Sequence, residues 1–167
     1  MMSEIGYIEH MVVCKPSVAM RFLRILGIML AVVFFILTMF SFFFIFLCIA
    51  AGVGAYFAGM NASIEYEYQY CDRELRVDKI YNKTRRKNMA KFETDRIEIL
   101  APISSYHLDD FKGKTYKELH YDSGYDDQRP DPRYVMIYDG REKVIFEPST
   151  EMVEAIRGVA PRKVYRD

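Results

Sequence analysis

The chain has 167 residues and a mass of 19.6 kDa, which fits one domain and excludes a multidomain enzyme. Its 23 basic and 23 acidic residues cancel, so we exclude a nucleic-acid partner held by overall positive charge. The mean hydropathy is near zero, but it averages two unlike halves, because no charged residue occurs between Arg24 and Glu65. The sequence therefore predicts a membrane segment joined to a soluble part.

Residues 1–16 form a lead-in to the uncharged run. Ser3 is a candidate helix cap, and Ile5, Ile8 and Val12 recur at helical spacing. Two interpretations stay open for this segment. It is either an amphipathic stretch whose apolar stripe lies on the membrane surface, or a terminus without regular structure.

The uncharged run from Ile25 to Ile64 is too long for one membrane crossing. Its 40 residues would make a straight helix of roughly 60 Å, whereas the hydrocarbon core is about 30 Å thick. We predict two transmembrane helices at about 17–39 and 42–60, within a membrane segment 17–60. The turn between them contains no Gly, Pro or charge, so the single-span alternative stays open.

Basic residues determine the expected orientation of the helices. Lys15, Arg21 and Arg24 precede or begin the first span and favour a cytoplasmic N-terminus. An even number of spans returns the chain to the same side, so we predict a multi-pass protein of the cell membrane with a cytoplasmic C-terminal domain. A single span would instead export that domain. The apolar run exceeds the roughly 7 to 15 residues of a signal-peptide core, so we expect it to stay attached.

Small residues concentrate in the second span. The stretch from Gly54 to Gly59 allows another helix to approach closely, although its spacing is not GxxxG. We therefore favour packing of one span on the other over a specific dimer.

The soluble domain, residues 61–167, begins with strict alternation. Tyr66, Tyr68 and Tyr70 alternate with polar residues, which indicates a half-buried strand whose tyrosines face the core. The sequence Asp139-Gly140 between two apolar runs is a strong hairpin signal. Seven strands are predicted near residues 64–70, 75–80, 85–92, 96–101, 116–121, 134–138 and 144–146, followed by an amphipathic helix at 150–157.

This layout resembles a pleckstrin-homology-like barrel. The resemblance rests on the run from Glu65 to Ala101, the hairpin from Tyr134 to Phe146 and the helix from Thr150 to Arg157. With two spans ahead of it, the chain is similar to small uncharacterised bacterial membrane proteins whose soluble part resembles bacterial pleckstrin-homology-like domains. The fold class is then α+β: a transmembrane hairpin, a mainly antiparallel barrel of about seven strands and a C-terminal helix. The resemblance implies no activity.

A basic run at residues 83–91 is the sharpest functional signal. Strand alternation places Lys83, Arg85, Lys87 and Lys91 on one face and Arg86 on the other. Such charges attract an anionic leaflet by about 1 kcal/mol each. The alternative is an edge strand whose lysines block pairing with another chain.

Catalytic and metal signals are weak in this sequence. His107, His120 and the loop from Asp122 to Asp131 supply titratable groups, but no base, nucleophile and orienting group stand in a recognised spacing. We therefore expect no cofactor, no metal and no catalytic residue. An enzyme that uses the His107 and His120 loops remains the competing hypothesis.

Together these features predict a membrane-anchored, non-enzymatic binding or scaffold module of unknown specificity. Its expected partners are the lipid bilayer, anionic lipid head groups at the basic run, and an unidentified membrane protein docked on the domain. The alternatives are a single-span protein with an exported domain, or the enzyme named above.

Overall fold

The computed structural model describes residues 7–166. The elements in chain order are β1 (Ile8–Val13), α1 (Val18–Leu37), α2 (Phe44–Ala62), β2 (Ile64–Cys71), β3 (Glu74–Tyr81), β4 (Arg85–Glu93), η1 (Thr94–Arg96), β5 (Ile97–Pro102), η2 (Tyr106–Phe111), β6 (Lys117–His120), β7 (Tyr134–Tyr138), β8 (Glu142–Phe146) and α3 (Thr150–Val159). The chain forms two compact units, a sheet unit of residues 7–14, 65–80 and 86–166 and a helical unit of residues 15–64 and 81–85. We describe each by itself.

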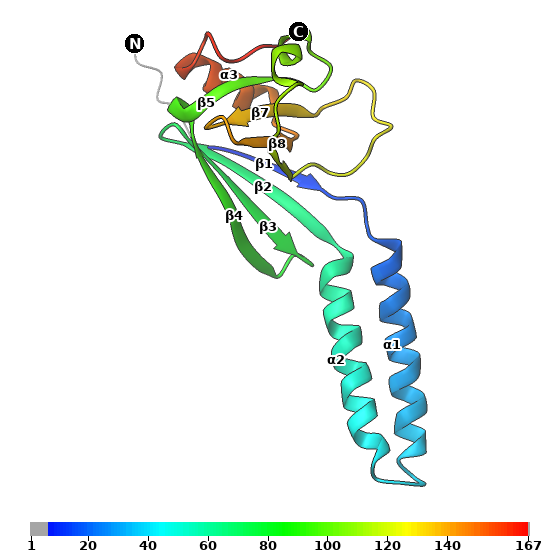
Figure 1. Cartoon of the computed structure of the whole chain (residues 1–167). Coiled ribbons are helices and arrows are strands. Elements are labelled where there is room, and N and C mark those ends of the chain that lie inside the picture. The colour runs from blue at the N-terminus through cyan, green and yellow to red at the C-terminus, as the bar shows by residue number, and fades with distance from the viewer. Residues whose placement is uncertain (1–6, 167) are drawn as a thin grey trace. The chain divides into compact units, whose positions relative to one another are not determined.

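Two four-stranded sheets build the sheet unit, in the orders β1-β2-β3-β4 and β5-β7-β8-β6 (Figure 1). The predicted strands form, but they are divided between two sheets, so the predicted barrel of about seven strands is not confirmed. The 3₁₀ turn η1 separates β4 from β5, and Thr94 in that turn is fixed by hydrogen bonds to the Arg73 carbonyl. β5 then pairs with β7, and the short β6 joins the far edge parallel to β8.

Strand β1 was not predicted. Residues 8–13 pair antiparallel with β2, from Ile8 opposite Tyr70 to Val13 opposite Glu65, so neither a helical lead-in nor a terminus without regular structure describes these residues. The positions of Ile8 and Val12 fit either structure, because residues four apart share a face in a strand as well as in a helix. Ser3 and Ile5 lie outside the described residues.

Tight turns join three pairs of strands. Both central residues have positive φ in each turn, the geometry that matches the twist of a two-residue hairpin. The pairs are Asp72 and Arg73, Asn82 and Lys83, and Asp139 and Gly140. The last pair confirms the hairpin predicted from Asp-Gly.

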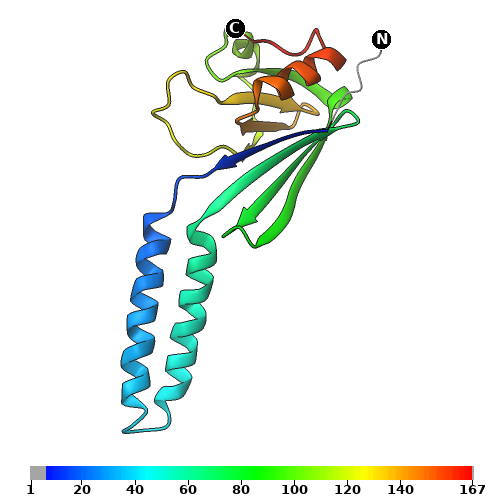
Figure 2. The same cartoon turned by 180° about the vertical axis from the view of Figure 1, so that it is seen from behind.

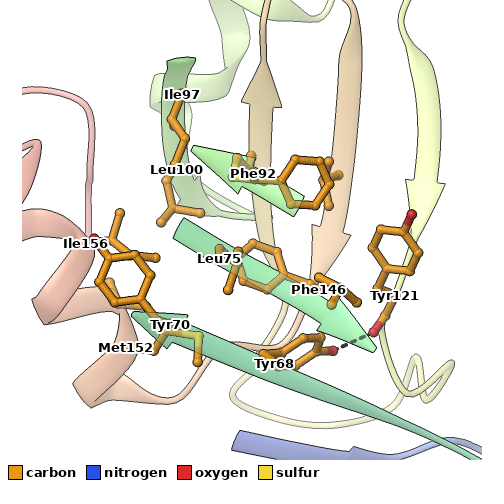
Figure 3. Packing of buried hydrophobic residues seen from close by; sticks show 14 of the residues in the cluster. Tyr68, Tyr70, Leu75, Phe92, Ile97, Leu100, Tyr121, Phe146, Met152 and Ile156 are labelled. Atoms are coloured by element: carbon orange, nitrogen blue, oxygen red, sulfur yellow. Dashed lines mark hydrogen bonds between the residues drawn. The ribbon is translucent and has the colours of Figure 1, made fainter. Parts of the chain in front are cut away.

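The main core lies between the two sheets and α3. Tyr68 and Tyr70 are fully buried there, as the alternation predicted, and the Tyr68 hydroxyl donates a hydrogen bond to the Tyr121 carbonyl (Figure 3). Helix α3 (Figure 2) begins at the Ser149 cap and packs its buried apolar face into this core. That face consists of Met152, Val153 and Ile156.

The helical unit contains α1 and α2, which are long and apolar enough to cross a membrane. Ser17 caps α1 by accepting a hydrogen bond from the Met20 amide. The helices approach closely at Gly27, where an added Cβ would lie 2.9 Å from the Ala55 Cβ. On α2 the packing uses the predicted small-residue stretch: Ala55, Ala58 and Gly59 are buried, and an added Cβ at Gly59 would lie 3.1 Å from the Arg24 side chain, whereas one at Gly54 would meet nothing within 4 Å among the described residues.

Candidate functional site

The second sheet has an outer face with a small cavity. Val135 and Ile137 of β7 form its floor, and Leu108 and Phe111 of η2 cover it together with Ile103. The cavity has a volume of about 230 Å³. Its apolar lining belongs to a second cluster of buried side chains, separate from the main core.

Local sequence explains why η2 covers this face. Ser105 begins the turn by accepting a hydrogen bond from the His107 amide. Residues three apart are eclipsed in a 3₁₀ helix, so Leu108 and Phe111 fall on the same side and both pack on the sheet. The sequence showed this spacing, but the cavity also needs side chains from β7 and β8, which lie far along the chain.

Charged side chains surround the opening. Among the lining residues, three are lysines and one is a glutamate. The Lys143 ammonium lies 2.8 Å from a Glu118 carboxylate oxygen, and the Lys114 ammonium lies 5.4 Å from the centre of the Phe111 ring. The third, Lys112, contacts Asp109 outside the lining. Two of the three lysines are thus each paired with a carboxylate.

One polar atom in the lining lacks a partner. The Tyr116 hydroxyl is buried and makes no hydrogen bond, and no other buried side-chain nitrogen or oxygen within residues 7–166 is in that state. Leaving such a group unsatisfied costs about 1–3 kcal/mol, so its presence calls for an explanation. The cavity itself offers an apolar surface with lysine side chains among its lining residues.

The predicted basic residues lie at or near β4, the edge of the first sheet. Lys83 sits in the turn before it, while Arg85, Lys87 and Lys91 are exposed along it. Lys91 forms an ion pair with Glu74 at 3.6 Å. In the helical unit, the amide of Asn82 donates a hydrogen bond to the carbonyl of Ser63, which ends α2, so this turn lies beside the end of that helix.

Arg86 has a separate role that the sequence did not indicate. Its guanidinium donates a hydrogen bond to Glu67, whose side chain is only 1% exposed, and it also lies 4.0 Å from Asp78. Gln69 donates a second hydrogen bond to the same buried carboxylate. Arg86 therefore neutralises an interior charge in the first sheet.

The two histidines of the competing enzyme hypothesis have different surroundings. The His107 ring stacks on Tyr165 with ring centres 3.7 Å apart, whereas the exposed His120 lies 3.7 Å from Asp122 and ends β6. β5, which η2 follows, and β6 are opposite edges of the second sheet. No group of three or more metal-ligating side chains occurs in the part of the chain from 7 to 166.

The acidic loop from Asp122 to Asp131 is organised around one arginine. Arg133 donates hydrogen bonds to both carboxylate oxygens of Asp131, and its guanidinium lies 2.8 Å from Asp126. Hydrogen bonds from Arg133 lower the pKa of Asp131. Asp126 and Asp131 are therefore paired with an arginine of the same protein.

A family comparison can now be added to this geometry. The family model described as Bacterial PH-like domain (DUF6106) matches residues 3–166. The chain belongs to this bacterial PH-like domain family. The match runs through β1, both apolar helices and the two sheets, which confirms the resemblance inferred from the strand pattern. No curated protein and no solved structure is significantly similar to the chain.

Proposed function

We propose that this PH-like protein is a membrane-anchored, non-enzymatic binding or scaffold module, with its sheet unit on the cytoplasmic side. The observation that carries the proposal is the pairing of β1 with β2. These neighbouring strands of one sheet lie immediately before α1 and immediately after α2 in the chain. The two helices are therefore an insertion between adjacent strands.

This connectivity supports an even number of membrane crossings. Val13 is opposite Glu65 in the sheet, so the chain leaves the sheet and returns to it at the same place. A single crossing would put β1 and β2 on opposite sides of the bilayer, where they could not pair. The pairing therefore supports two crossings over the single-span alternative.

The surface of the helices supports the same proposal. None of the residues of α1 is buried, and large apolar side chains such as Phe22, Phe35 and Phe46 are more than half exposed. A soluble monomer rarely exposes so much contiguous apolar surface. Arg21 and Arg24, near the start of α1, favour a cytoplasmic location for that end by the positive-inside bias.

Labelling of cysteines from one side of the membrane tests the orientation. In a chain with Cys14 and Cys48 replaced by Ala, the exposed Cys71 should react with an impermeant thiol reagent only after the cells are permeabilised. The matched control is Ser41→Cys with Cys71 also replaced, which puts the thiol in the turn between the helices. That variant should react in intact cells. Labelling of Cys71 in intact cells contradicts the proposal.

We further propose that Lys83, Arg85, Lys87 and Lys91 contact anionic lipid head groups. The hydrogen bond between Asn82 and the end of α2 supports this, because it ties the β3–β4 turn to the helix end that would meet the head groups. The full chain in nanodiscs with anionic lipid should show slower hydrogen exchange at residues 83–91 than in zwitterionic nanodiscs. Salt should remove the difference as the Debye length falls to about 3 Å at 1 M. Equal exchange in both lipids would leave these residues as protection of a sheet edge.

A further inference from the structure

We infer that a groove between α1 and α2 binds one anionic phospholipid, with an acyl chain along the groove and the phosphate on the guanidinium of Arg24. The inference deepens the proposed anchoring and rests on it, because a lipid reaches this groove when the helices lie in a bilayer. It concerns the helical unit alone. The site is separate from the head-group contact proposed for the basic residues at and near β4.

The groove runs along one side of the contact between the two helices. Residues three or four positions apart share a face of a helix, so each helix contributes one continuous wall. An added Cβ at Gly52 would meet nothing within 4 Å among the described residues, so the groove is open at this position. The walls are apolar and offer space for an extended hydrocarbon chain. They include Ile28, Val32 and Phe35 of α1 and Gly52 and Tyr56 of α2.

The length of the groove matches one leaflet of a bilayer. Its lining on α1 extends from Arg24 to Phe35, which is roughly 16 Å of helix at about 1.5 Å per residue. Half of the hydrocarbon core, the depth that one acyl chain occupies, is about 15 Å. Arg24 also stands at the boundary of the apolar segment, because the uncharged run begins at the next residue. A phospholipid whose phosphate lies at Arg24 therefore places an acyl chain along the groove.

Arg24 contributes a charge without a partner at the end of this groove. Its side chain lies against α2 where Gly59 leaves room for it, because an added Cβ there would be 3.1 Å away. Within residues 7–166 the Arg24 side chain makes no hydrogen bond and no ion pair. Charged side chains of membrane segments are normally paired, and a guanidinium donates two parallel hydrogen bonds to a phosphate. A lipid phosphate is the anion that the bilayer itself supplies at its boundary.

A second copy of the chain is a poorer occupant of the groove. Its membrane helices bring no carboxylate to Arg24, because no acidic residue occurs between Arg24 and Glu65. The guanidinium would then be covered without a counter-charge, which is unfavourable in an apolar medium. The charge of Arg24 therefore favours a lipid phosphate over a helix from another copy.

Native mass spectrometry of the full chain in detergent tests the inference. The chain is titrated with dioleoyl phosphatidylglycerol, which carries an anionic phosphate. The matched probe is dioleoylglycerol, which has the same acyl chains and no phosphate. We expect one phosphatidylglycerol to bind per chain, at a Kd at least tenfold below that of dioleoylglycerol.

A pair of arginine variants tests the contact with the phosphate. Arg24→Gln should raise the Kd of phosphatidylglycerol about tenfold and leave that of dioleoylglycerol unchanged. Arg21→Gln is the matched control, because it removes the same charge one turn earlier on α1 and lies outside the groove lining. It should change neither Kd.

A pair of glycine variants tests the position of the acyl chain. Gly52→Leu should raise the Kd of both lipids about tenfold, because the new side chain fills the groove. Gly54→Leu is the control, since an added Cβ has open space there too but Gly54 does not line the groove. It should change neither Kd. Thermal unfolding at 222 nm should be alike for the two variants.

Several results would overturn the inference. These are equal affinity for the two lipids, equal effects of Arg24→Gln and Arg21→Gln, or equal effects of Gly52→Leu and Gly54→Leu on lipid binding. A stable dimer that Gly52→Leu abolishes would assign the groove to a second copy instead. The titration in detergent does not depend on orientation, so failure of the cysteine labelling and failure of the lipid site are distinguished.

Discussion

Replacing Arg86 with Met should destabilise the sheet unit far more than the same change at Lys87. The two are neighbouring basic residues on β4, but only Arg86 contacts the buried carboxylate of Glu67. Lys87 is exposed and forms no ion pair with any residue from 7 to 166. The comparison therefore separates a charge that stabilises the fold from one that does not.

The structure gives the magnitude of this effect. Removing one partner of a fully buried ion pair costs about 3–5 kcal/mol, because the other charge stays in the interior without compensation. Here the Glu67 side chain is 1% exposed, but that of Arg86 is 54% exposed, so water already screens the pair. Gln69 also keeps its hydrogen bond to the carboxylate in the variant. We expect a loss of about 2 kcal/mol for Arg86→Met and at most about 0.5 kcal/mol for Lys87→Met.

Tyrosine signals provide the assay. The chain has 13 tyrosines and no tryptophan, and Tyr68 and Tyr70 lie in the core, so near-ultraviolet circular dichroism reports the packing of this unit. For a domain of about 100 residues, a loss of 2 kcal/mol lowers the Tm by roughly 8 °C. Adding Glu67→Gln to Arg86→Met should recover much of the loss, since no unpaired charge remains. The reasoning is refuted if Arg86→Met and Lys87→Met lower the Tm equally, or if the double variant recovers nothing.

Two further predictions concern the helices and the thiols. Gly27→Val should destabilise the helical unit by about 1–3 kcal/mol in thermal unfolding followed at 222 nm, because the new side chain meets Ala55. Gly52→Val, where an added Cβ has open space, should have little effect, and equal destabilisation by the two variants would contradict the packing. Burial raises the pKa of Cys14 to about 11, so at pH 8 its alkylation should be more than tenfold slower than that of Cys71 and should accelerate toward pH 11. The raised pKa of Cys14 also predicts that the free energy of unfolding declines above about pH 9, where this thiol ionises only in the unfolded chain. Comparable alkylation rates of Cys14 and Cys71 at pH 8 would show that Cys14 is not buried.

Local patterns were sufficient to predict most strands. Tyr66, Tyr68 and Tyr70 alternate along β2 because they share the face of that strand that packs in the main core, and Asp139-Gly140 accommodates the positive φ of its turn. The partition into two sheets was not predictable in this way. It depends on the break at η1 and on the parallel pairing of β6 with β8, which joins segments distant in the chain.

Neither β1 nor the cavity could be predicted from local sequence patterns, for related reasons. Ile8 and Val12 are spaced as in a helix, and the strand that pairs with them begins only after two long helices. Leu108, Phe111 and Tyr116 could be recognised as apolar positions, but the cavity forms only when β7 brings its outer face beneath η2. The alternation along β2 predicts that Glu67 faces solvent. It is buried instead, and its partner Arg86 comes from β4 at the edge of the sheet.

The insertion of the helices between β1 and β2 is the central claim, and replacing them with a turn tests it most directly. Because Val13 and Glu65 are opposite each other, residues 14–64 can be exchanged for Asn-Gly, a two-residue turn that closes an antiparallel pair. We predict that this variant is soluble without detergent and keeps the near-ultraviolet tyrosine signal of the full chain, whereas residues 61–167 alone, which lack β1, lose that signal. A turn variant that still needs detergent, or a fragment 61–167 that folds equally well, would contradict the account.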